Sequence, residues 1–253
     1  MNGPRILLWD TENFPAQGYF YEFYKEGNIV KIIEPPFLLS YSAKWLGEDK
    51  VITKALCDYK GYRGGDHDDY RLVEDLAKLL DSADYYVAHN GDKHDIRMTN
   101  TRLVCNGLGP LIPRKTIDTL KIARSKFNFL NNKLDSLGSF LGVGRKLPNT
   151  GFDLWERCER GERKAWQEMK AYNAQDVLLL EKVYLKLRPF ATTHPNLNLI
   201  TRASGCPKCG STHLQKRGFS YRLNTEAQRY QCVACGAWSE GKQEKIDSRV
   251  TVR

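Results

Sequence analysis

No stretch of this sequence is apolar over the roughly 18 residues that a membrane helix needs. The N-terminal MNGPRILLWDTEN holds only a short apolar run that stops at acidic residues, which does not match a secretory signal peptide. Internal repeats and low-complexity tracts are also absent from the sequence. We therefore expect an intracellular protein with a cytoplasmic location and no membrane partner.

Acidic residues are in deficit: 30 Asp and Glu stand against 39 Lys and Arg, for a formal net charge of +9 at pH 7. The excess is uneven, because residues 190–253 hold ten basic and four acidic side chains, a net +6. The chain of 253 residues is 41% apolar, enough to bury a core and to argue against intrinsic disorder. The positive charge is a weak indication of a polyanionic partner.

Three of the seven cysteines, Cys57, Cys105 and Cys158, have no neighbour in sequence, and we interpret them as inert thiols in a reducing compartment. The other four form two Cys-x-x-Cys knuckles with 22 residues between them: Cys206 and Cys209, then Cys232 and Cys235. This spacing is typical of a tetrahedral site for one structural Zn²⁺. A pair of disulfides or a redox motif is the alternative, and no βαβ pattern surrounds these cysteines to favour it.

The composition divides the chain into four parts. Residues 189–204 are rich in Pro, Asn and Thr, which is typical of a linker. It separates a large domain, residues 1–188, from a zinc ribbon at 205–240, and a polar tail follows at 241–253. Between the knuckles, two strand-like runs flank Asn224, which predicts the hairpin of the ribbon.

Basic and aromatic residues alternate within this hairpin. The basic ones are candidates for binding the substrate: Lys216, Arg217, Arg222 and Arg229. Their charges could neutralise phosphates, while the interleaved Phe219, Tyr221 and Tyr230 could stack on unpaired bases. Two alternatives stay open, namely aromatic side chains that form the ribbon's own small core, and a surface that docks a protein partner.

The large domain begins with strand-like runs and continues with alternating strands and helices. We expect strands at residues 5–9, 19–24, 29–33, 37–45, 51–58 and 85–88, with a turn at Lys25–Asn28. We expect helices at residues 68–80, 93–106, after Asp118, at 134–141 and, as one or two helices, at 161–187. This order predicts an α/β fold with a mixed sheet flanked by helices.

Three groups of polar residues stand at informative places on these elements. Asp10 and Glu12 follow the first strand, and residues i and i+2 of an extended chain point to the same side. Two such carboxylates repel each other unless a cation lies between them. Asn90 and Asp95 follow a later strand, where Asn90 can cap the next helix. The third pair is Tyr172 and Asp176, four residues apart on one helical face.

Together the three groups resemble the three motifs of the DnaQ-like 3′–5′ exonucleases, which have a ribonuclease H-like fold. Tyr172 in the third motif resembles the DEDDy branch, which includes proofreading domains of family-B DNA polymerases. The likeness covers roughly residues 4–188 and departs from the usual pattern at Trp9 and His94. Neither departure removes a ligand.

The resemblance implies two-metal hydrolysis of a phosphodiester that releases nucleoside 5′-monophosphates. Asp10 would bridge two Mg²⁺ or Mn²⁺ ions about 3.5–4 Å apart. Glu12 and Asp176 would complete the site of the ion that activates water, and Asp95 would hold the second. Tyr172, with an unperturbed pKa near 10, would orient the water rather than deprotonate it.

Other polar residues near the motifs have smaller roles. We interpret Asn90 as a helix cap that can also bind substrate. Asp118 is interpreted as a second cap, and support of a metal ligand is the alternative for it. Lys93, Arg97 and Arg102 could line the substrate groove, although a solvated basic helix face is an equal alternative.

We therefore expect a metal-dependent 3′–5′ exonuclease acting on single-stranded or 3′-ended nucleic acid, with DNA slightly ahead of RNA. One alternative is a non-catalytic, zinc-dependent nucleic-acid-binding or adaptor protein on the same fold. The other is a structure-specific endonuclease, since fold-level analogy alone does not decide among these.

Overall fold

The computed structural model describes residues 3–21 and 29–246 of the chain. Those residues form two compact units, and the division lies between Tyr184 and Leu185, near the end of a long helix. The larger unit starts at Arg5, and the smaller one contains the described residues from Leu185 onward together with Gly3 and Pro4.

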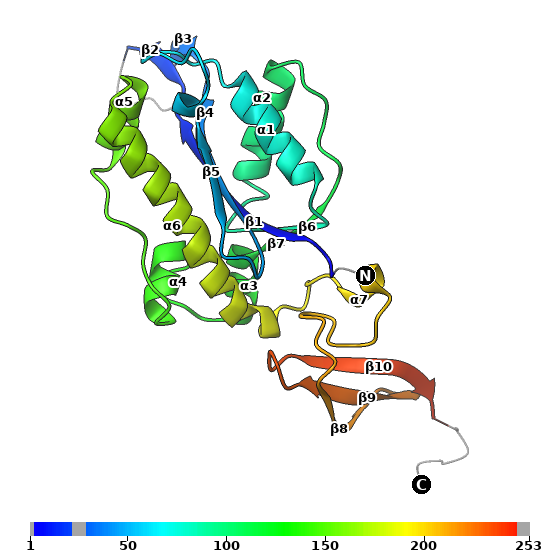
Figure 1. Cartoon of the computed structure of the whole chain (residues 1–253). Helices are drawn as coiled ribbons and strands as arrows, with labels where there is room; N and C mark the ends of the chain where they lie inside the picture. The colour runs from blue at the N-terminus through cyan, green and yellow to red at the C-terminus, as the bar shows by residue number, and fades with distance from the viewer. Residues whose placement is uncertain (1–2, 22–28, 247–253) are drawn as a thin grey trace. The chain divides into compact units, whose positions relative to one another are not determined.

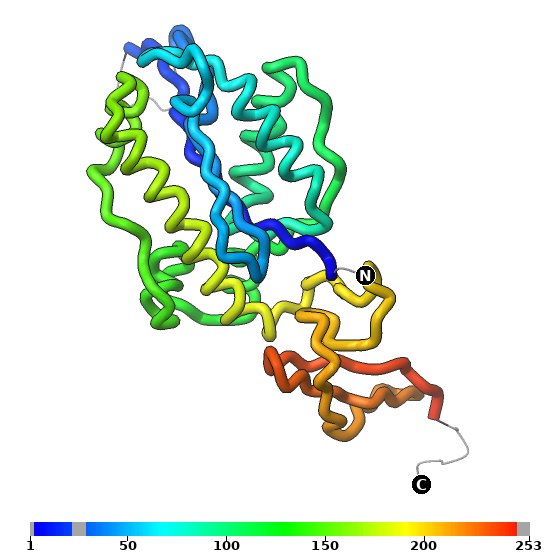
Figure 2. The backbone as a smooth tube through the Cα atoms, viewed as in Figure 1, coloured from blue at the N-terminus to red at the C-terminus, as the bar shows by residue number. Residues whose placement is uncertain are grey.

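A five-stranded mixed sheet forms the centre of the larger unit. Its strands are β1 (Ile6–Phe14), β4 (Phe37–Trp45), β5 (Val51–Ala55), β6 (Tyr85–Ala88) and β7 (Lys115–Asp118). The order across the sheet is β5-β4-β1-β6-β7. Strand β1 is antiparallel to β4, with which it runs side by side in the backbone trace (Figure 2), and parallel to β6. The predicted mixed sheet is confirmed.

Helices cover both faces of this sheet. They are α1 (Tyr70–Asp81), α2 (Asp95–Cys105), α3 (Thr119–Lys126), α4 (Leu134–Phe140), α5 (Phe152–Glu159) and α6 (Arg163–Leu187). Helices α1 and α2 lie on one face, and α6 crosses the other (Figure 1). Helix α1 buries Leu72, Leu76 and Leu80 because these residues repeat at the spacing of one helical face.

Strand β1 is the central strand and is buried along most of its length. Trp9 is fully buried, and its ring meets the ring of Tyr86 on β6 edge-on, with 6.2 Å between centroids. Because helices cover both faces of the sheet, apolar residues follow one another on β1 without alternation. The strand therefore carries its C-terminal residues into the interior of the unit.

Several elements differ from the sequence-based expectations. Strand β1 does not end at Trp9 but continues to Phe14, because β4 pairs with it as far as Phe37. Strand β7 and helix α5 were not predicted, since each is short. Residues 163–187 form one helix, the first of the two alternatives considered.

A two-stranded hairpin follows β1 and consists of β2 (Gln17–Phe20) and β3 (Ile29–Glu34). The predicted turn at Lys25–Asn28 lies outside the described residues. The antiparallel pairing of β2 with β3 agrees with the predicted hairpin. The apolar side chains of β3 are exposed, so the hairpin adds nothing to the main core.

The smaller unit holds one short helix, α7 (Asn198–Thr201), and an antiparallel sheet of β8 (Leu214–Tyr221), β9 (Thr225–Cys232) and β10 (Trp238–Lys245). The polar tail predicted for residues 241–253 was wrong for residues 241–245. These continue β10, because Lys245 still pairs with Thr225. Across the described parts of the chain, no helix combines the length and apolar character that crossing a bilayer requires.

Candidate metal centres and substrate cleft

Three carboxylates of the larger unit converge on one point. Asp10 and Glu12 point from β1, and Asp176 points from α6; each offers an oxygen within 4.8 Å of the others. The i and i+2 positions of β1 place Asp10 and Glu12 on the same side of the strand, as predicted. Asp176 is fully buried.

Asn173 holds Asp10 in place. Its side-chain amide donates to Asp10 Oδ2 at 2.9 Å, and its own oxygen lies 3.4 Å from the Ser40 hydroxyl, which donates to it. Asn173 is fully buried, so this amide fixes the orientation of the Asp10 carboxylate. Asn173 was not among the predicted site residues, although its position next to Tyr172 was a usable signal.

Asp95 does not join the group of three. It lies in the first turn of α2, and its Oδ1 accepts hydrogen bonds from the Thr11 hydroxyl at 2.7 Å and from the Thr11 backbone N–H at 3.2 Å. These two bonds turn the Asp95 carboxylate towards Thr11, the residue of β1 that lies between Asp10 and Glu12. Asp95 is buried and lines the same hollow as the other acids.

Burial and mutual repulsion make these acids hard to ionise. Burial, followed by the neighbouring charges of Asp95, Glu12 and Asp176, raises the pKa of Asp10 well above its ordinary value. Burial and the charge of Asp176 raise the pKa of Glu12 to about 8. Burial also raises the pKa of Asp95 and of Asp176. Acids crowded in this way are stabilised in their charged form by a cation between them.

Lys146 supplies one cation to this group. It comes from the segment between α4 and α5, and its ammonium donates to Asp176 Oδ2 at 2.5 Å and to the Tyr172 hydroxyl at 3.2 Å. Burial acts to lower the pKa of Lys146, but the charge of Asp176, the hydrogen bond to it and the charges of Tyr172 and Asp10 together outweigh burial, so the net shift is upward. Nothing in the local sequence singles out this lysine, so it was not among the predicted site residues.

Tyr172 lies beside the acids with its hydroxyl protonated. Burial and the charge of Asp176 raise the pKa of Tyr172 to about 12. Its ring packs edge-on against Trp155 of α5, with 6.1 Å between centroids. The hydroxyl is therefore held in one place as a hydrogen-bonding group and is a poor base at neutral pH.

The group fits a hard divalent cation. Its donors are carboxylate oxygens, the ligands that Mg²⁺ and Mn²⁺ prefer in proteins. Within residues 3–21 and 29–246, the buried Asp176 Oδ1 accepts no hydrogen bond from any protein group. An unsatisfied buried carboxylate oxygen is costly, and a metal ion would satisfy it.

Two hollows adjoin the acids. The larger, of about 780 Å³, is lined by Asp10, Glu12 and Asp95 and by the basic side chains Arg124 and Lys133. The smaller, of about 330 Å³, shares Glu12 with it and has an apolar wall, formed by Phe14, Pro15, Pro36, Met98 and Trp155. Glu12 therefore lies between the two hollows, of which the larger carries both acidic and basic side chains and the smaller has the apolar wall.

Asn90 lines the larger hollow but does not cap α2, so that prediction was wrong. Its φ of 68° is left-handed, and the helix starts only at Asp95, after a turn. The predicted cap at Asp118 is confirmed, because its Oδ1 accepts from the backbone N–H of Leu120 at 2.9 Å, and also from that of Asn90 at 3.0 Å.

Arg102 is not available to a substrate. Its guanidinium is buried against Asp69, with Nε donating to Oδ2 at 2.7 Å and Nη2 to Oδ1 at 2.8 Å. A third bond, from Nη1 to the Pro36 carbonyl at 3.2 Å, joins α2 to the connection between β3 and β4. The candidate groove residue is thus part of the framework under the site.

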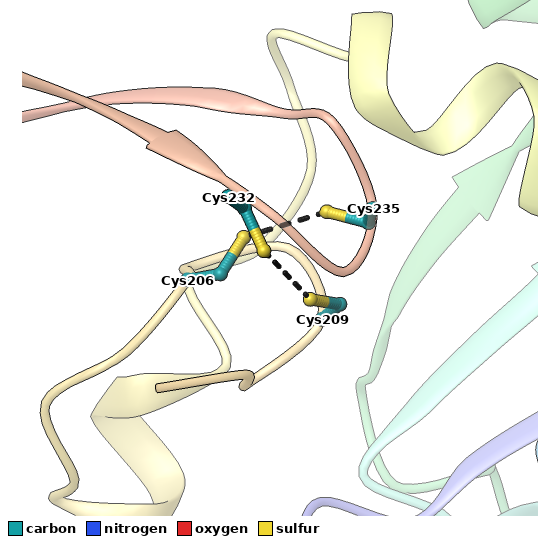
Figure 3. Close-up of side chains that lie close together, drawn as sticks. All are labelled: Cys206, Cys209, Cys232 and Cys235. Atoms are coloured by element: carbon teal, nitrogen blue, oxygen red, sulfur yellow. Dashed lines mark hydrogen bonds between the residues drawn. The ribbon is translucent and has the colours of Figure 1, made fainter. Parts of the chain in front are cut away.

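The four cysteines of the two knuckles form a second cluster in the smaller unit (Figure 3). The Sγ atoms of Cys206 and Cys235 are 3.7 Å apart, and those of Cys209 and Cys232 are 3.6 Å apart. Four thiolates at about 2.3 Å from a zinc ion in a tetrahedron lie about 3.8 Å from one another. The spacing therefore fits a closed tetrahedral metal site, and all seven cysteines are free thiols.

Backbone N–H groups favour the thiolate form at this cluster. Burial acts to raise the pKa of Cys232, but hydrogen bonds from the backbone of Cys235 and Ala234, together with those from the thiols of Cys209 and Cys235, outweigh it and lower the pKa to about 7. Burial raises the pKa of Cys209 and of Cys235. A bound cation would favour deprotonation of all four thiols.

The predicted basic residues of the ribbon lie on β8 and β9 or next to them, and most are solvent-exposed. Arg229 lies over the ring of Trp238, 5.9 Å from its centroid. Arg222 is 3.5 Å from a carboxylate oxygen of Glu240. Lys216 lies opposite Tyr230 in the sheet, so it makes neither a cation–π contact with Trp238 nor an ion pair with Glu240.

Comparisons with known proteins agree with this fold. A family model described as the RNase_H superfamily matches residues 46–188, a range that includes Asp95, Tyr172 and Asp176 but not Asp10 or Glu12. The family B DNA polymerase from the hyperthermophilic archaeon Pyrobaculum calidifontis is similar in structure, with a TM-score of 0.53 and 12% sequence identity over 88% of this chain. The match spans 32% of that polymerase. No curated protein matches the chain.

Proposed function

Because the chain belongs to the RNase_H superfamily, we propose that it is a metal-dependent 3′–5′ exonuclease of the DEDDy type. Its substrate is a single-stranded nucleic acid, and its products are nucleoside 5′-monophosphates. The observation that carries this proposal is the convergence of Asp10, Glu12 and Asp176 beside the hydroxyl of Tyr172.

Asp10, Glu12 and Asp176 would hold Mg²⁺ or Mn²⁺, with Asp95 nearby to complete a second site. Bound metal would supply a nucleophilic water at neutral pH and offset charge on the leaving 3′-oxygen. Asn173 keeps Asp10 oriented for this role, and Thr11 does the same for Asp95.

Tyr172 and Lys146 act on the water and the phosphate rather than as ligands. The protonated hydroxyl of Tyr172 orients the attacking water, and the Lys146 ammonium, 3.2 Å away, keeps that hydroxyl in place. The positive charge also reduces repulsion between the acids and an incoming phosphodiester. Positioning and charge stabilisation therefore provide most of what the side chains contribute.

The two hollows suggest how a strand end would bind. The apolar hollow beside Glu12, with Trp155 in its wall, suits an unpaired terminal base. Arg124 and Lys133 in the larger hollow suit the phosphates that follow. A base enters such a hollow only when it is unpaired, which favours a single-stranded 3′ end. The similar polymerase acts on DNA, which favours DNA over RNA.

The cysteine cluster would hold one structural Zn²⁺. All four ligands are thiolates, so no coordination position is open for water or substrate. We assign it no part in hydrolysis.

The test uses 5′-labelled and 3′-labelled DNA and RNA strands of the same sequence, with and without Mn²⁺. We expect mononucleotides to leave from the 3′ end, only with metal. Asp10→Asn should lower the rate by roughly 10³-fold or more, equivalent to about 4 kcal/mol. Asp92→Asn is the matched control, because this acid pairs with Lys121 and lies outside the group, and should keep the wild-type rate.

Each other outcome selects a different function. Cleavage at internal junctions would select the endonuclease alternative. Binding without products, unchanged in Asp10→Asn, would select the adaptor alternative and overturn the proposal. Equal cleavage of the DNA and RNA strands would overturn the preference for DNA alone.

A further inference from the structure

The register of the ribbon sheet separates most of its basic residues from most of its aromatic ones. Residues that face each other across strands, and residues two apart on a strand, share a face. Tyr230 lies opposite Lys216, and Gln228 lies opposite Phe219. Lys216, Phe219, Tyr221 and Tyr230 therefore share one side, which we call the aromatic face.

A β-bulge explains how Lys216 and Phe219 stay on one side although they are three residues apart. The register shifts between them, so Arg217 and Gly218 together oppose Arg229. Gly218 has a φ of +70°, and a Cβ added to it would lie 3.6 Å from Arg229 Nη2. Arg217 and Arg229 therefore lie on the opposite side of the sheet, the basic face.

Three contacts identify the other members of the basic face. Arg229 lies over the Trp238 ring at 5.9 Å. Arg222 lies 3.5 Å from Glu240, whose register partner is Arg229. Lys245 pairs with Thr225, which alternates onto the same side as Arg229. The basic face thus contains four cations, Arg217, Arg222, Arg229 and Lys245, together with Trp238 and the acid Glu240. Arg229 lies over Trp238, whereas Arg222 and Lys245 lie towards the other end of the sheet, near Thr225.

The two faces differ in charge. The aromatic face carries Glu226 and Glu244, which lie in register with Tyr221, and so repels a phosphate backbone at that end. The basic face carries an excess of cations and one large aromatic side chain that is 50% exposed. Cations that follow a backbone, together with a ring on which a base can stack, are the combination that binds single strands.

We propose that the basic face binds single-stranded nucleic acid, with Arg217, Arg222, Arg229 and Lys245 on its phosphates and Trp238 stacked on an unpaired base. This binding site is separate from the proposed hydrolysis and does not depend on it. Phe219, Tyr221 and Tyr230, the aromatic residues that the sequence alone favoured, lie on the aromatic face and take no part in it.

The test measures the Kd of a labelled 20-nucleotide strand by fluorescence anisotropy, with full-length protein carrying Asp10→Asn so that the strand stays intact. We expect Trp238→Ala to weaken binding about tenfold, as the loss of one stacked base does. Arg217→Gln with Arg229→Gln should weaken it more at low salt and reduce the salt slope by about 0.7 for each phosphate that is no longer neutralised. The matched control, Phe219→Ala with Tyr221→Ala, should change Kd by less than about twofold.

Zinc content and the thermal transition of each variant show whether the ribbon has kept its fold. Loss of binding in the aromatic-face control equal to that in Trp238→Ala would overturn the assignment of faces. An unchanged Kd in both sets of folded basic-face variants would overturn the nucleic-acid site and leave the face to a protein partner. If the nuclease proposal fails, the wild-type protein releases no products. The comparison of Kd values among the ribbon variants still measures strand binding by the ribbon.

Discussion

The acidic cluster and the cysteine cluster of this protein are built in opposite ways. The acidic cluster gathers carboxylates that repel one another, and burial raises the pKa of Asp10, Glu12 and Asp176. It opens onto a hollow of about 780 Å³ and already contains one cation, Lys146. The cysteine cluster has four thiols at tetrahedral spacing, and its ligands enclose the central point.

The two clusters differ in how far the fold of their unit depends on a bound metal. The larger unit has a continuous apolar core, so its fold does not depend on the acids, which strain it instead. The buried apolar cluster around the cysteines consists of Ala237 and the cysteines themselves, with Leu214 packed against it. A metal is therefore expected to be optional for the fold of one unit and essential for that of the other.

The largest expected effect tests this dependence. Cys232→Ser should release zinc and unfold the ribbon, since structural zinc sites contribute about 10–16 kcal/mol at neutral pH. Circular dichroism and zinc analysis measure the loss. Asp10→Asn serves as the control, because it should keep the zinc and the fold. A ribbon that stays folded without zinc would show that a metal is not essential for the fold of the smaller unit.

Sequence predicted most of the framework and both clusters. Strands at residues 37–45 and 85–88 were predicted to the residue. The first follows two prolines and alternates apolar residues with Ser40, Ser42 and Lys44, and the second is a compact apolar run between Asp84 and His89. The knuckle spacing and the i, i+2 geometry of Asp10 and Glu12 are local properties, and local patterns are readable in a sequence. The spacing of the two knuckles therefore predicted a cluster that the structure shows.

What sequence missed depends on tertiary contacts. Lys146 reaches Asp176 only because the segment after α4 folds back over α6, and no local pattern encodes that return. Arg102 has the same appearance as a surface arginine in sequence, yet Asp69 draws it into the interior. The separation of basic and aromatic residues in the ribbon depends on one bulge near Gly218, which shifts the alternation.

A smaller effect is expected at Lys146, the cation within the acidic cluster. Lys146→Gln leaves the buried Asp176 carboxylate without its partner, which should lower the stability of the metal-free larger unit by on the order of 2 kcal/mol. Mn²⁺ should restore part of this loss, because metal and ammonium offset the same charges. Thermal unfolding followed by tryptophan fluorescence, with and without Mn²⁺, measures both.

Activity gives a second reading of the same change. Lys146→Gln should lower kcat by roughly 10- to 100-fold, since Tyr172 loses the group that holds its hydroxyl. Lys121→Gln removes an exposed lysine that pairs with Asp92 and should leave kcat unchanged. A full wild-type kcat in Lys146→Gln would show that the lysine is only a counter-charge.

The smallest expected effect is a gain of stability at Glu12. The pKa of Glu12 is raised from 4.5 to about 8 in the folded, metal-free protein. Between these two pH values the folded state holds a proton that the unfolded state has released, so stability falls as pH rises through this window. Glu12→Gln removes this penalty and should stabilise the metal-free larger unit at pH 8 by about 1 kcal/mol or more, roughly 2–4 °C in Tm.

The pH dependence distinguishes this cause from a general packing effect. At pH 4.5 most of the Glu12 carboxyl groups are protonated in the folded protein, so the gain from Glu12→Gln should shrink towards zero there. With saturating Mn²⁺ at pH 8 the order should reverse, because wild type binds the metal and the variant binds it less well. A gain of the same size at both pH values, or one that survives Mn²⁺, would mean that the strain at the acidic cluster is not electrostatic. The contrast with the cysteine cluster would then rest on core size alone.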